Sequence, residues 1–220
     1  MKTSYEYIVL GCGGIGSAAV YWLSRVAGKE VLGLEQFRLG HDNGGSQDHS
    51  RIIRLSYHAP EYTALTPHTY EAYAEVEEES GVQLVFRTGG LDLELVRDGQ
   101  SEFVNLYASA MRDAGIPHEE LSADQVMDRW PQFRLEQEVR AVYQPDGGLV
   151  DPRKTNAAHI ALARARGATV LDEAPVLGVS TTSDGVEVST PRGVFSARRL
   201  VVTAGSWTNN VLCHVGMTLP

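Results

Sequence analysis

A short glycine-rich stretch near the N-terminus constrains the fold of this chain more than any other feature. Four apolar or aromatic residues lead into three glycines with the spacing G-x-G-x-x-G: Gly11, Gly13 and Gly16. A second apolar run ends at Glu35, about 20 residues after the last of these glycines. Strand, tight turn, helix, strand and acid in this order predict a dinucleotide-binding βαβ unit.

Each part of this motif has a physical reason. Gly11 permits the tight turn, Gly13 lets a pyrophosphate approach the backbone, and Gly16 lets the helix pack close to the strand. The helix N-terminus presents unpaired N–H groups and a positive dipole end to phosphates. Glu35 would accept hydrogen bonds from a ribose hydroxyl. The simpler alternative is a glycine turn without a ligand, and the motif alone does not separate FAD from NAD.

The composition is that of an acidic globular protein. The 220 residues are 43% hydrophobic, and the formal net charge of −9 argues against nucleic acid as a partner, because phosphate binding needs a basic face. The two cysteines, Cys12 and Cys213, give neither a metal-ligand spacing nor a disulfide framework. The apolar runs are too short to span a membrane and no signal-peptide pattern is present, so we expect a cytoplasmic protein.

Two features predict how the chain continues after the nucleotide unit. The first helix carries apolar residues at spacings of three and four, which predict one apolar face: Ile15, Ala18, Ala19, Trp22, Leu23 and Val26. A polar loop over 36–50 then leads into Arg51-Ile52-Ile53-Arg54. The two arginines share one face if this segment is a helical turn. A pair of solvated surface arginines is the alternative, and the residues alone favour it slightly.

The nucleotide domain is predicted to be discontinuous. Residues 1–82 begin it, 83–144 form an excursion rich in strand and helix, and 145–220 return to the sheet. The return begins with a turn-rich segment at 145–152. Further expected features are a turn at Asp98-Gly99, a capping box at Ser122 and Gln125, a helix over 153–166, buried strands at 168–171 and 200–205, a hairpin within 176–188 and a helix cap at Ser206.

The sequence resembles the D-amino-acid-oxidase-like FAD enzymes. Within that family it is most similar to the monomeric sarcosine oxidases and N-methyltryptophan oxidases. The resemblance covers the whole chain. The segments that carry it occur in the family's order: the glycine turn, SRIIR at 50–54, GGLVDP at 147–152 and TAGSW at 203–207. The arginine-pair segment is more specific than the glycine motif, so it raises the functional interpretation of Arg51 and Arg54 above the surface alternative.

The resemblance implies an α/β fold: a Rossmann-type FAD-binding domain with a parallel sheet and an interleaved, partial antiparallel-sheet substrate domain. It implies FAD-dependent oxidation of the C–N bond of a secondary amine or N-methyl amino acid. The flavin takes a hydride equivalent, the imine hydrolyses, and molecular oxygen reoxidises the flavin to give hydrogen peroxide. The redox chemistry belongs to the cofactor, while the protein orients the reactants.

The resemblance also implies roles for individual residues. Arg54 resembles the arginine that binds the substrate carboxylate, for which a planar, bidentate guanidinium is suited. Arg51 lies on the flavin side, and both arginines are candidate catalytic residues. The candidate cofactor-binding residues are Gly11, Gly13, Gly14, Gly16, Glu35, Gln36, Ser46, Ser50, Arg51, Ile52, Val176, Ala204, Gly205 and Trp207.

The sequence departs from the family pattern in two ways. Gly45 and Gln47 stand where the family often has Ser and His, and His49 is the nearby histidine that would substitute. In such enzymes the cysteine that bonds to FAD, the lysine that promotes reaction with oxygen and much of the substrate pocket lie beyond the point equivalent to Pro220. The resemblance therefore implies the FAD-binding half of an enzyme, with the remainder on a second polypeptide or in a longer parent.

Three hypotheses remain from the sequence. The first is an FAD-dependent amine oxidase or its FAD-binding part. The second is an NAD-dependent dehydrogenase with the same fingerprint, against which the arginine pair and the 203–207 segment argue. The third is a truncated or split chain that binds a nucleotide without turnover. A bound flavin chromophore separates the first from the second, and peroxide formation separates the first from the third.

Overall fold

The structure is a computed structural model that describes residues 2–97 and 102–220, so the turn predicted at Asp98-Gly99 lies outside the described residues. Its contacts divide the chain into two compact units. The first unit comprises Met1–His49, Glu79–Val82 and Asp151–Pro220, and the second comprises Ser50–Glu78 and Gln83–Val150. Residues 50–78 therefore cluster with the excursion. The assignment of an FAD-binding domain and a substrate domain stays a prediction.

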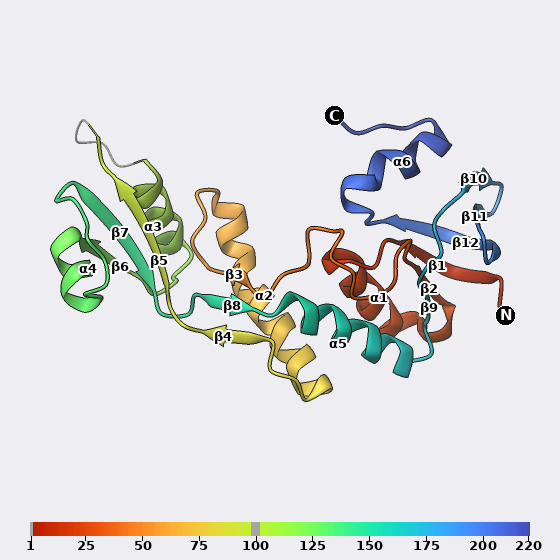
Figure 1. Cartoon of the computed structure of the whole chain (residues 1–220), viewed down its shortest axis with the longest axis horizontal. Helices are drawn as coiled ribbons and strands as arrows, with labels where there is room; N and C mark the ends of the chain where they lie inside the picture. Colours follow the sequence, from red (N-terminus) through yellow and green to blue (C-terminus); the bar gives the residue numbers. More distant parts are fainter. Residues whose placement is uncertain (1, 98–101) are drawn as a thin grey trace. The chain divides into compact units, whose positions relative to one another are not determined.

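The first unit is built on a mixed, mainly parallel sheet with the strand order β10-β11-β12-β1-β2-β9 (Figure 1). Strands β12, β1, β2 and β9 run parallel, and β10 and β11 extend the sheet as an antiparallel hairpin. The predicted hairpin is confirmed, and β9 confirms the predicted strand at 168–171. The strand predicted at 200–205 is confirmed only in part, because β12 ends at Val202 and its last residues are half-buried. The strands are β1 Ser4–Leu10, β2 Val31–Leu34, β9 Thr169–Leu171, β10 Gly178–Thr182, β11 Gly185–Thr190 and β12 Gly193–Val202.

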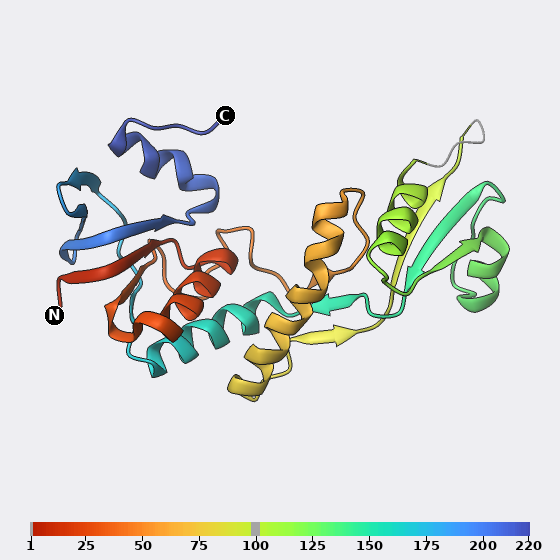
Figure 2. The ribbon, with the colours of Figure 1, turned by 180° about the vertical axis from the view of Figure 1, so that it is seen from behind.

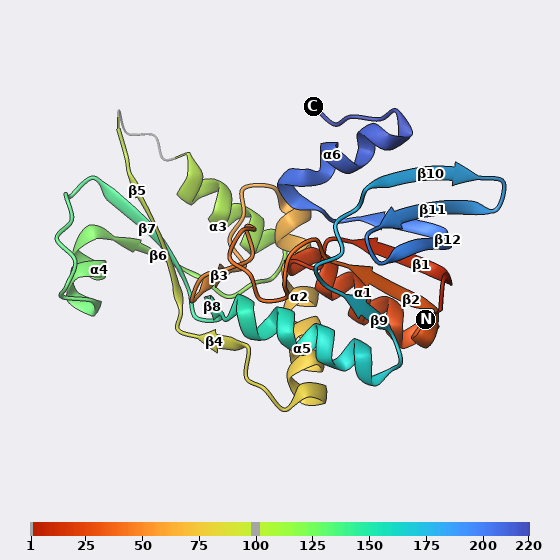
Figure 3. The same cartoon turned by 45° about the vertical axis from the view of Figure 1, so that its right-hand side comes forward.

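Apolar clusters cover this sheet on both faces. On one face, α1 and α5 pack together through Val20, Ile160 and Ala163 against Val9 and Val170 (Figure 3). On the other face, a second cluster packs α6 against the β10–β11 hairpin and against side chains of the neighbouring strands. A mainly parallel sheet needs apolar cover on both faces, as the predicted Rossmann-type fold requires. The helices are α1 Gly14–Ala27, α5 Pro152–Ala165 and α6 Thr208–Leu212, with short 3-10 turns at Gly28–Glu30, Gly205–Trp207 and Cys213–Val215.

The apolar face predicted for α1 is only partly buried: Ala19 and Leu23 pack against the apolar cluster, but other members of the predicted set do not. Ile15 is 77% exposed and Val26 is 82% exposed, whereas Ser17, Val20 and Ser24 are buried. Two serines can lie on the buried face because each hydroxyl donates within its own helix: Ser17 Oγ to Gly14 O at 3.3 Å, and Ser24 Oγ to Tyr21 O at 2.6 Å. Small residues with satisfied hydroxyls allow the close packing that larger apolar side chains would prevent.

The two predicted helix caps have different outcomes. Ser122 and Gln125 form the expected capping box at the start of α4, each side chain accepting the other's backbone N–H. Ser206 does not cap a helix, because it lies inside the 3-10 turn that precedes α6. Instead, the Thr208 hydroxyl donates to the Gly205 carbonyl at 2.8 Å. A serine just before the predicted helix did not indicate that a turn of 3-10 helix comes first.

The second unit contains two small antiparallel sheets (Figure 2). In the larger, β5-β7-β6, the alternation of Ala141 and Val142 presents one residue to α4 and the next to α3. The turn-rich segment at 145–152 also holds β8, the central strand of the sheet β3-β8-β4. The elements are β3 Arg51–Ile53, α2 Pro60–Ser80, β4 Val85–Arg87, β5 Gly90–Leu95, α3 Phe103–Asp113, β6 Glu119–Ser122, α4 Ala123–Arg129, β7 Val139–Gln144 and β8 Gly148–Val150.

Between α1 and α5, a buried histidine fills the space beside the first turn of α1. His159 is 6% exposed, and its Nδ1 lies 3.2 Å from the Ser17 hydroxyl oxygen. Its ring stacks on Tyr21 with centroids 5.4 Å apart. Burial lowers the pKa of His159 to about 4. The side chain is therefore neutral in the folded protein at pH values where an exposed histidine is charged.

The closeness of α1 to β1 gives the first prediction. A Cβ at position 16 would lie 1.7 Å from the Gly11 carbonyl oxygen and 2.7 Å from Thr203 Oγ1. Because the nearest obstacle is backbone, Gly16→Ala should lower the free energy of unfolding by about 3 kcal/mol, measured by urea denaturation. Gly45→Ala is the control, since its Cβ would meet nothing within 4 Å. Equal stability of the two variants would contradict the close packing.

The second prediction concerns pH. Between pH 6.5 and about 4 the unfolded chain protonates His159 while the folded chain does not, so acidification through this window favours unfolding. This group alone should remove on the order of 3 kcal/mol of stability. His159→Gln should flatten that part of the pH profile, whereas His68→Gln, at an exposed histidine, should leave it as in the wild type. Parallel profiles for wild type and His159→Gln would rule out this assignment.

Candidate functional site

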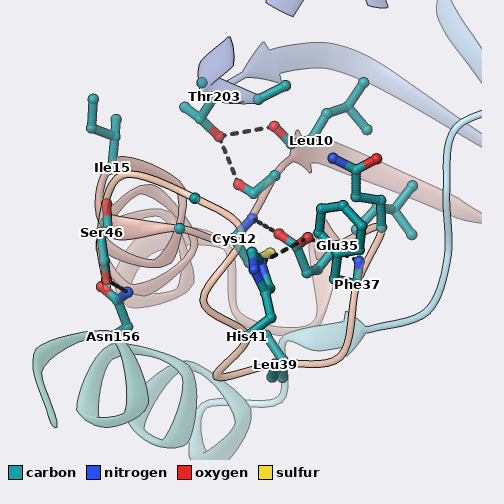
Figure 4. A pocket seen from close by; sticks show the side chains of 18 of the residues that line it. Leu10, Cys12, Ile15, Glu35, Phe37, Leu39, His41, Ser46, Asn156 and Thr203 are labelled. Atoms are coloured by element: carbon teal, nitrogen blue, oxygen red, sulfur yellow. Dashed lines mark hydrogen bonds and ion pairs between the residues drawn. The ribbon is translucent and has the colours of Figure 1, made fainter. Parts of the chain in front are cut away.

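The glycine turn joins β1 to α1 in the geometry that the motif predicts. Gly11 has φ +89°, a conformation that side-chain-bearing residues rarely adopt, and its N–H donates to the Leu34 carbonyl at 2.8 Å. The Thr203 hydroxyl, at the end of β12, donates at 3.0 Å to Leu10 O and lies 2.8 Å from Gly11 O (Figure 4). The ends of β1, β2 and β12 are therefore tied together around the turn.

Glu35 is the central polar residue of the site. It is only 5% exposed, and its two carboxylate oxygens accept backbone hydrogen bonds from Cys12 N at 2.8 Å and Phe37 N at 3.0 Å. His41 approaches the same carboxylate, with Nε2 3.3 Å from Oε1 (Figure 4). A carboxylate has about four acceptor positions, so these contacts leave capacity for hydroxyl donors.

A cavity of about 970 Å³ opens in front of this turn. It is formed entirely by residues of the first unit: the carboxyl ends of β1, β2 and β12, the loop after β2, and one side of α5. In an open α/β sheet, ligands bind outside the carboxyl ends of the strands, which is where this cavity lies. Its volume is at the upper end of the usual range for small-molecule sites, as a large dinucleotide requires.

The cavity suits the pyrophosphate of a dinucleotide at the start of α1. The N-cap position is Gly13, and no side chain of the described residues caps this helix. Its first N–H groups are therefore available to an anion, and the helix dipole favours negative charge there. Ser46 lies over this turn, since its Oγ would be 2.6 Å from a Cβ at Gly14, and Asn156 Nδ2 donates to Ser46 O at 3.3 Å (Figure 4).

Aromatic side chains lie on the side of the cavity next to Glu35. Phe37 packs edge-on against His41, with centroids 4.8 Å apart, and against Trp207, with centroids 5.5 Å apart. All three line the cavity together with Val176. This arrangement offers flat apolar surface beside hydrogen-bond acceptors, which is the chemistry that an adenosine group needs.

Cys12 lines the cavity but is not a reactive thiol. It is 5% exposed, and burial, with the nearby Glu35 carboxylate, raises the pKa of its thiol far above the ordinary value. The thiolate is the nucleophilic form of cysteine, so this side chain stays protonated and acts as a small apolar residue.

Most of the predicted cofactor residues line the cavity, and the others lie elsewhere. Gly16 packs behind the turn against Gly11, as its proposed role requires. Ser50, Arg51 and Ile52 belong to the second unit, where Ile52 is 77% exposed. The predicted residues that line the cavity are Gly11, Gly13, Gly14, Glu35, Gln36, Ser46, Val176, Ala204, Gly205 and Trp207.

The helical turn that would place Arg51 and Arg54 on one face does not form. Residues Arg51–Ile53 form strand β3, which pairs with β8, and Arg54 follows directly after it. Successive strand residues alternate in direction, so positions three apart do not share a face. Arg51 is exposed, and its NH1 donates to Ser50 O at 2.9 Å.

Arg54 has a defined environment within the second unit. Its NH1 donates to Asp92 Oδ1 at 3.1 Å, and its guanidinium lies 4.9 Å from the centroid of the Tyr57 ring. Burial opposes the charged form, but the Asp92 carboxylate and Tyr57 outweigh this penalty and raise the pKa of Arg54. The interpretation as a fully solvated surface arginine therefore does not hold for Arg54.

Sequence reasoning missed several residues of the site. His41 lines the cavity and contacts Glu35, whereas His49, the histidine considered in the sequence, is exposed. Asn156 reaches Ser46 from α5, more than a hundred positions away in the chain. The position of His41 in the glycine-rich loop was a usable signal. No local pattern connects Asn156 or Asp92 to their partners, because those contacts depend on tertiary packing.

Over residues 2–97 and 102–220, none of the helices combines the length and the apolar character needed to cross a bilayer.

Comparison with known proteins identifies relatives along the whole chain. A monomeric sarcosine oxidase from Streptomyces avermitilis is 36% identical over 99% of this chain and 56% of its own length. An N-methyl-L-tryptophan oxidase from Yersinia pestis is 30% identical over 97% of this chain and 57% of its own length. The chain thus spans about half the length of the curated relatives it matches.

Solved structures agree with this result. NikD, described as an unusual amino acid oxidase essential for nikkomycin biosynthesis, matches in its open form with a TM-score of 0.85 and 30% identity. The match covers 99% of this chain and 56% of that one. The family described as FAD dependent oxidoreductase (DAO) matches residues 6–219. With its glycine turn, its buried acid and its cavity at the strand ends, this chain belongs to the DAO family of FAD-dependent oxidoreductases.

Proposed function

We propose that this chain binds FAD in the cavity of the first unit and forms part of an enzyme that oxidises the C–N bond of a secondary amine or N-methyl amino acid. The observation that carries the proposal is the buried Glu35, held by two backbone N–H groups at the mouth of a dinucleotide-sized cavity. Sarcosine and N-methyl-L-tryptophan oxidases among the relatives support the class of substrate.

Each part of the cavity fits one part of FAD. The turn at Gly11, Gly13 and Gly14 with the start of α1 would hold the pyrophosphate. Glu35 would accept hydrogen bonds from the adenosine ribose. Phe37 and Val176 would contact the adenine side, and Ala204, Gly205 and Trp207 would close over the cofactor. We assign Ser50, Arg51 and Ile52 to the flavin side on the resemblance to the family.

When bound, FAD supplies the acceptor for the hydride equivalent that leaves the substrate. The chain supplies binding and orientation. Arg54 would bind the substrate carboxylate through its guanidinium and thereby fix the position of the neighbouring C–N bond. We propose that molecular oxygen is the final acceptor and that hydrogen peroxide is the product.

The third prediction tests the cofactor. In Glu35→Gln, one of the two backbone N–H groups that now face a carboxylate oxygen would meet an amide NH₂ group. This mismatch distorts the turn, so affinity for FAD should fall roughly 10- to 100-fold, measured by flavin fluorescence on titrating the apoprotein. NADH is titrated in parallel, and circular dichroism checks the fold.

The control for this test is Glu30→Gln, which removes an exposed carboxylate that pairs with Lys2 at the start of β2. It should bind FAD as the wild type does. Tight binding of NADH without binding of FAD would favour a nicotinamide-dependent dehydrogenase over the proposed function. Equal FAD affinity in both variants would remove Glu35 from the cofactor site.

The fourth prediction tests the substrate side. In the complete enzyme, Arg54→Ala should raise KM for an N-methyl amino acid by roughly 30-fold, since a charged hydrogen bond to the carboxylate is worth about 2 kcal/mol. The KM for the corresponding decarboxylated amine should change much less. Initial rates of peroxide formation give both values, and Arg112→Ala, at an exposed arginine that pairs with Glu120, is the control. The same change in KM for both substrates would count against carboxylate binding by Arg54.

A further inference from the structure

Arg54 is already engaged by an acid of its own unit. Asp92, on β5, accepts from Arg54 NH1 at 3.1 Å. The two side chains are 33% and 21% exposed, so water screens the pair only partly. A substrate carboxylate that binds Arg54 therefore meets a guanidinium whose charge is already balanced, and it meets a second carboxylate beside it.

Asp92 is held in place by a buried chain of hydrogen bonds. Its Oδ2 accepts from the Ser56 hydroxyl at 2.5 Å, and Ser56 Oγ accepts from Gln144 Nε2 at 2.6 Å. Gln144 Oε1 in turn accepts from Leu55 N at 2.5 Å. Ser56 and Gln144 are fully buried. Because each of these polar groups has a hydrogen-bond partner, the series of hydrogen bonds fixes the position of the Asp92 carboxylate on β5.

The guanidinium also contacts two aromatic rings. Its central carbon lies 4.9 Å from the Tyr57 ring centroid and 5.6 Å from that of Tyr107, on α3. Such contacts attract a cation without saturating its N–H donors. Arg54 thus contacts two rings and one fixed acid, and the Asp92 carboxylate lies beside any carboxylate that binds this guanidinium.

We propose that Asp92 is a specificity-determining residue that competes with the substrate carboxylate for Arg54. The inference rests on the proposed function, because that function assigns carboxylate binding to Arg54. A simple carboxylate anion is repelled by Asp92, whereas a zwitterion brings a cationic nitrogen that Asp92 attracts. The Arg54–Asp92 pair therefore selects amino acids with a charged amine next to the carboxylate over plain carboxylic acids.

The test measures binding at Arg54 directly, without turnover. The full chain is labelled with ¹⁵N-arginine, and the Arg54 Nε–H resonance, identified by its loss in Arg54→Lys, is followed during titration with acetate and, separately, with sarcosine. Asp92→Asn keeps an oxygen acceptor for the Ser56 hydroxyl and removes the charge. It should tighten acetate binding about tenfold and sarcosine binding by clearly less, so the preference for the zwitterion falls.

Asp146→Asn is the matched control, because it makes the same chemical change at an acid that pairs with a different arginine, Arg87, in the same unit. It should leave both affinities as in the wild type. Asp92→Ser is the second variant should Asp92→Asn fail to fold, and the same gain for acetate is expected. Equal acetate affinity in wild type and the folded Asp92 variant, or no response of Arg54 to either ligand, would overturn the proposal.

The same samples separate this inference from the proposed function. A chain that fails to bind FAD, but in which Asp92→Asn strengthens acetate binding at Arg54, would refute the proposed function and support competition by Asp92. A chain that binds FAD and forms peroxide, but in which Asp92→Asn changes nothing at Arg54, would support the proposed function and refute the competition.

Discussion

The close approach of α1 to β1 is the contact on which the nucleotide site depends. A side chain at position 16 would overlap the Gly11 carbonyl, so only glycine allows the helix to start directly at the strand end. That placement puts the uncapped N–H groups of α1 at the cavity. The same packing explains why Ser17 and Ser24 are buried and Ile15 is exposed. Function at the helix N-terminus and packing along its length therefore have one cause.

Glu35 carries this geometry from the turn to the second strand. One carboxylate oxygen accepts from Cys12 N in the turn, and the other accepts from Phe37 N in the loop after β2. A buried carboxylate is costly unless hydrogen bonds satisfy it, and here two backbone donors and the His41 ring do so. The acid thus has a structural role before any ligand is present. Both backbone N–H groups need an acceptor oxygen, so a side chain with a single acceptor oxygen would leave one of them unpaired.

The sequence predicted the features that local rules govern. The glycine spacing, the buried parallel strands and the capping box at Ser122 follow from backbone conformation, apolar runs and helix-end hydrogen bonds, which act over a few residues. The buried face of α1 was predicted only in part, because periodicity counts apolar residues, whereas close packing here also selected small serines. Arg54 was recognised through the family resemblance, but its partner was not. Asp92 lies on another strand, and only the fold brings the two within 3.1 Å.

The two charged groups central to this chain are satisfied by different means, and this determines what each can bind. Glu35 is held by backbone N–H groups, which carry no net charge, so its own negative charge remains available to hydroxyl donors. Arg54 is held by a formal anion, so its positive charge is largely balanced before a ligand arrives. A group held by neutral dipoles keeps its affinity for an opposite charge or dipole, whereas a group held by a counter-ion shares its charge between that counter-ion and the ligand. Sharing weakens binding but makes it selective, because the ligand must also be compatible with the carboxylate that remains beside it.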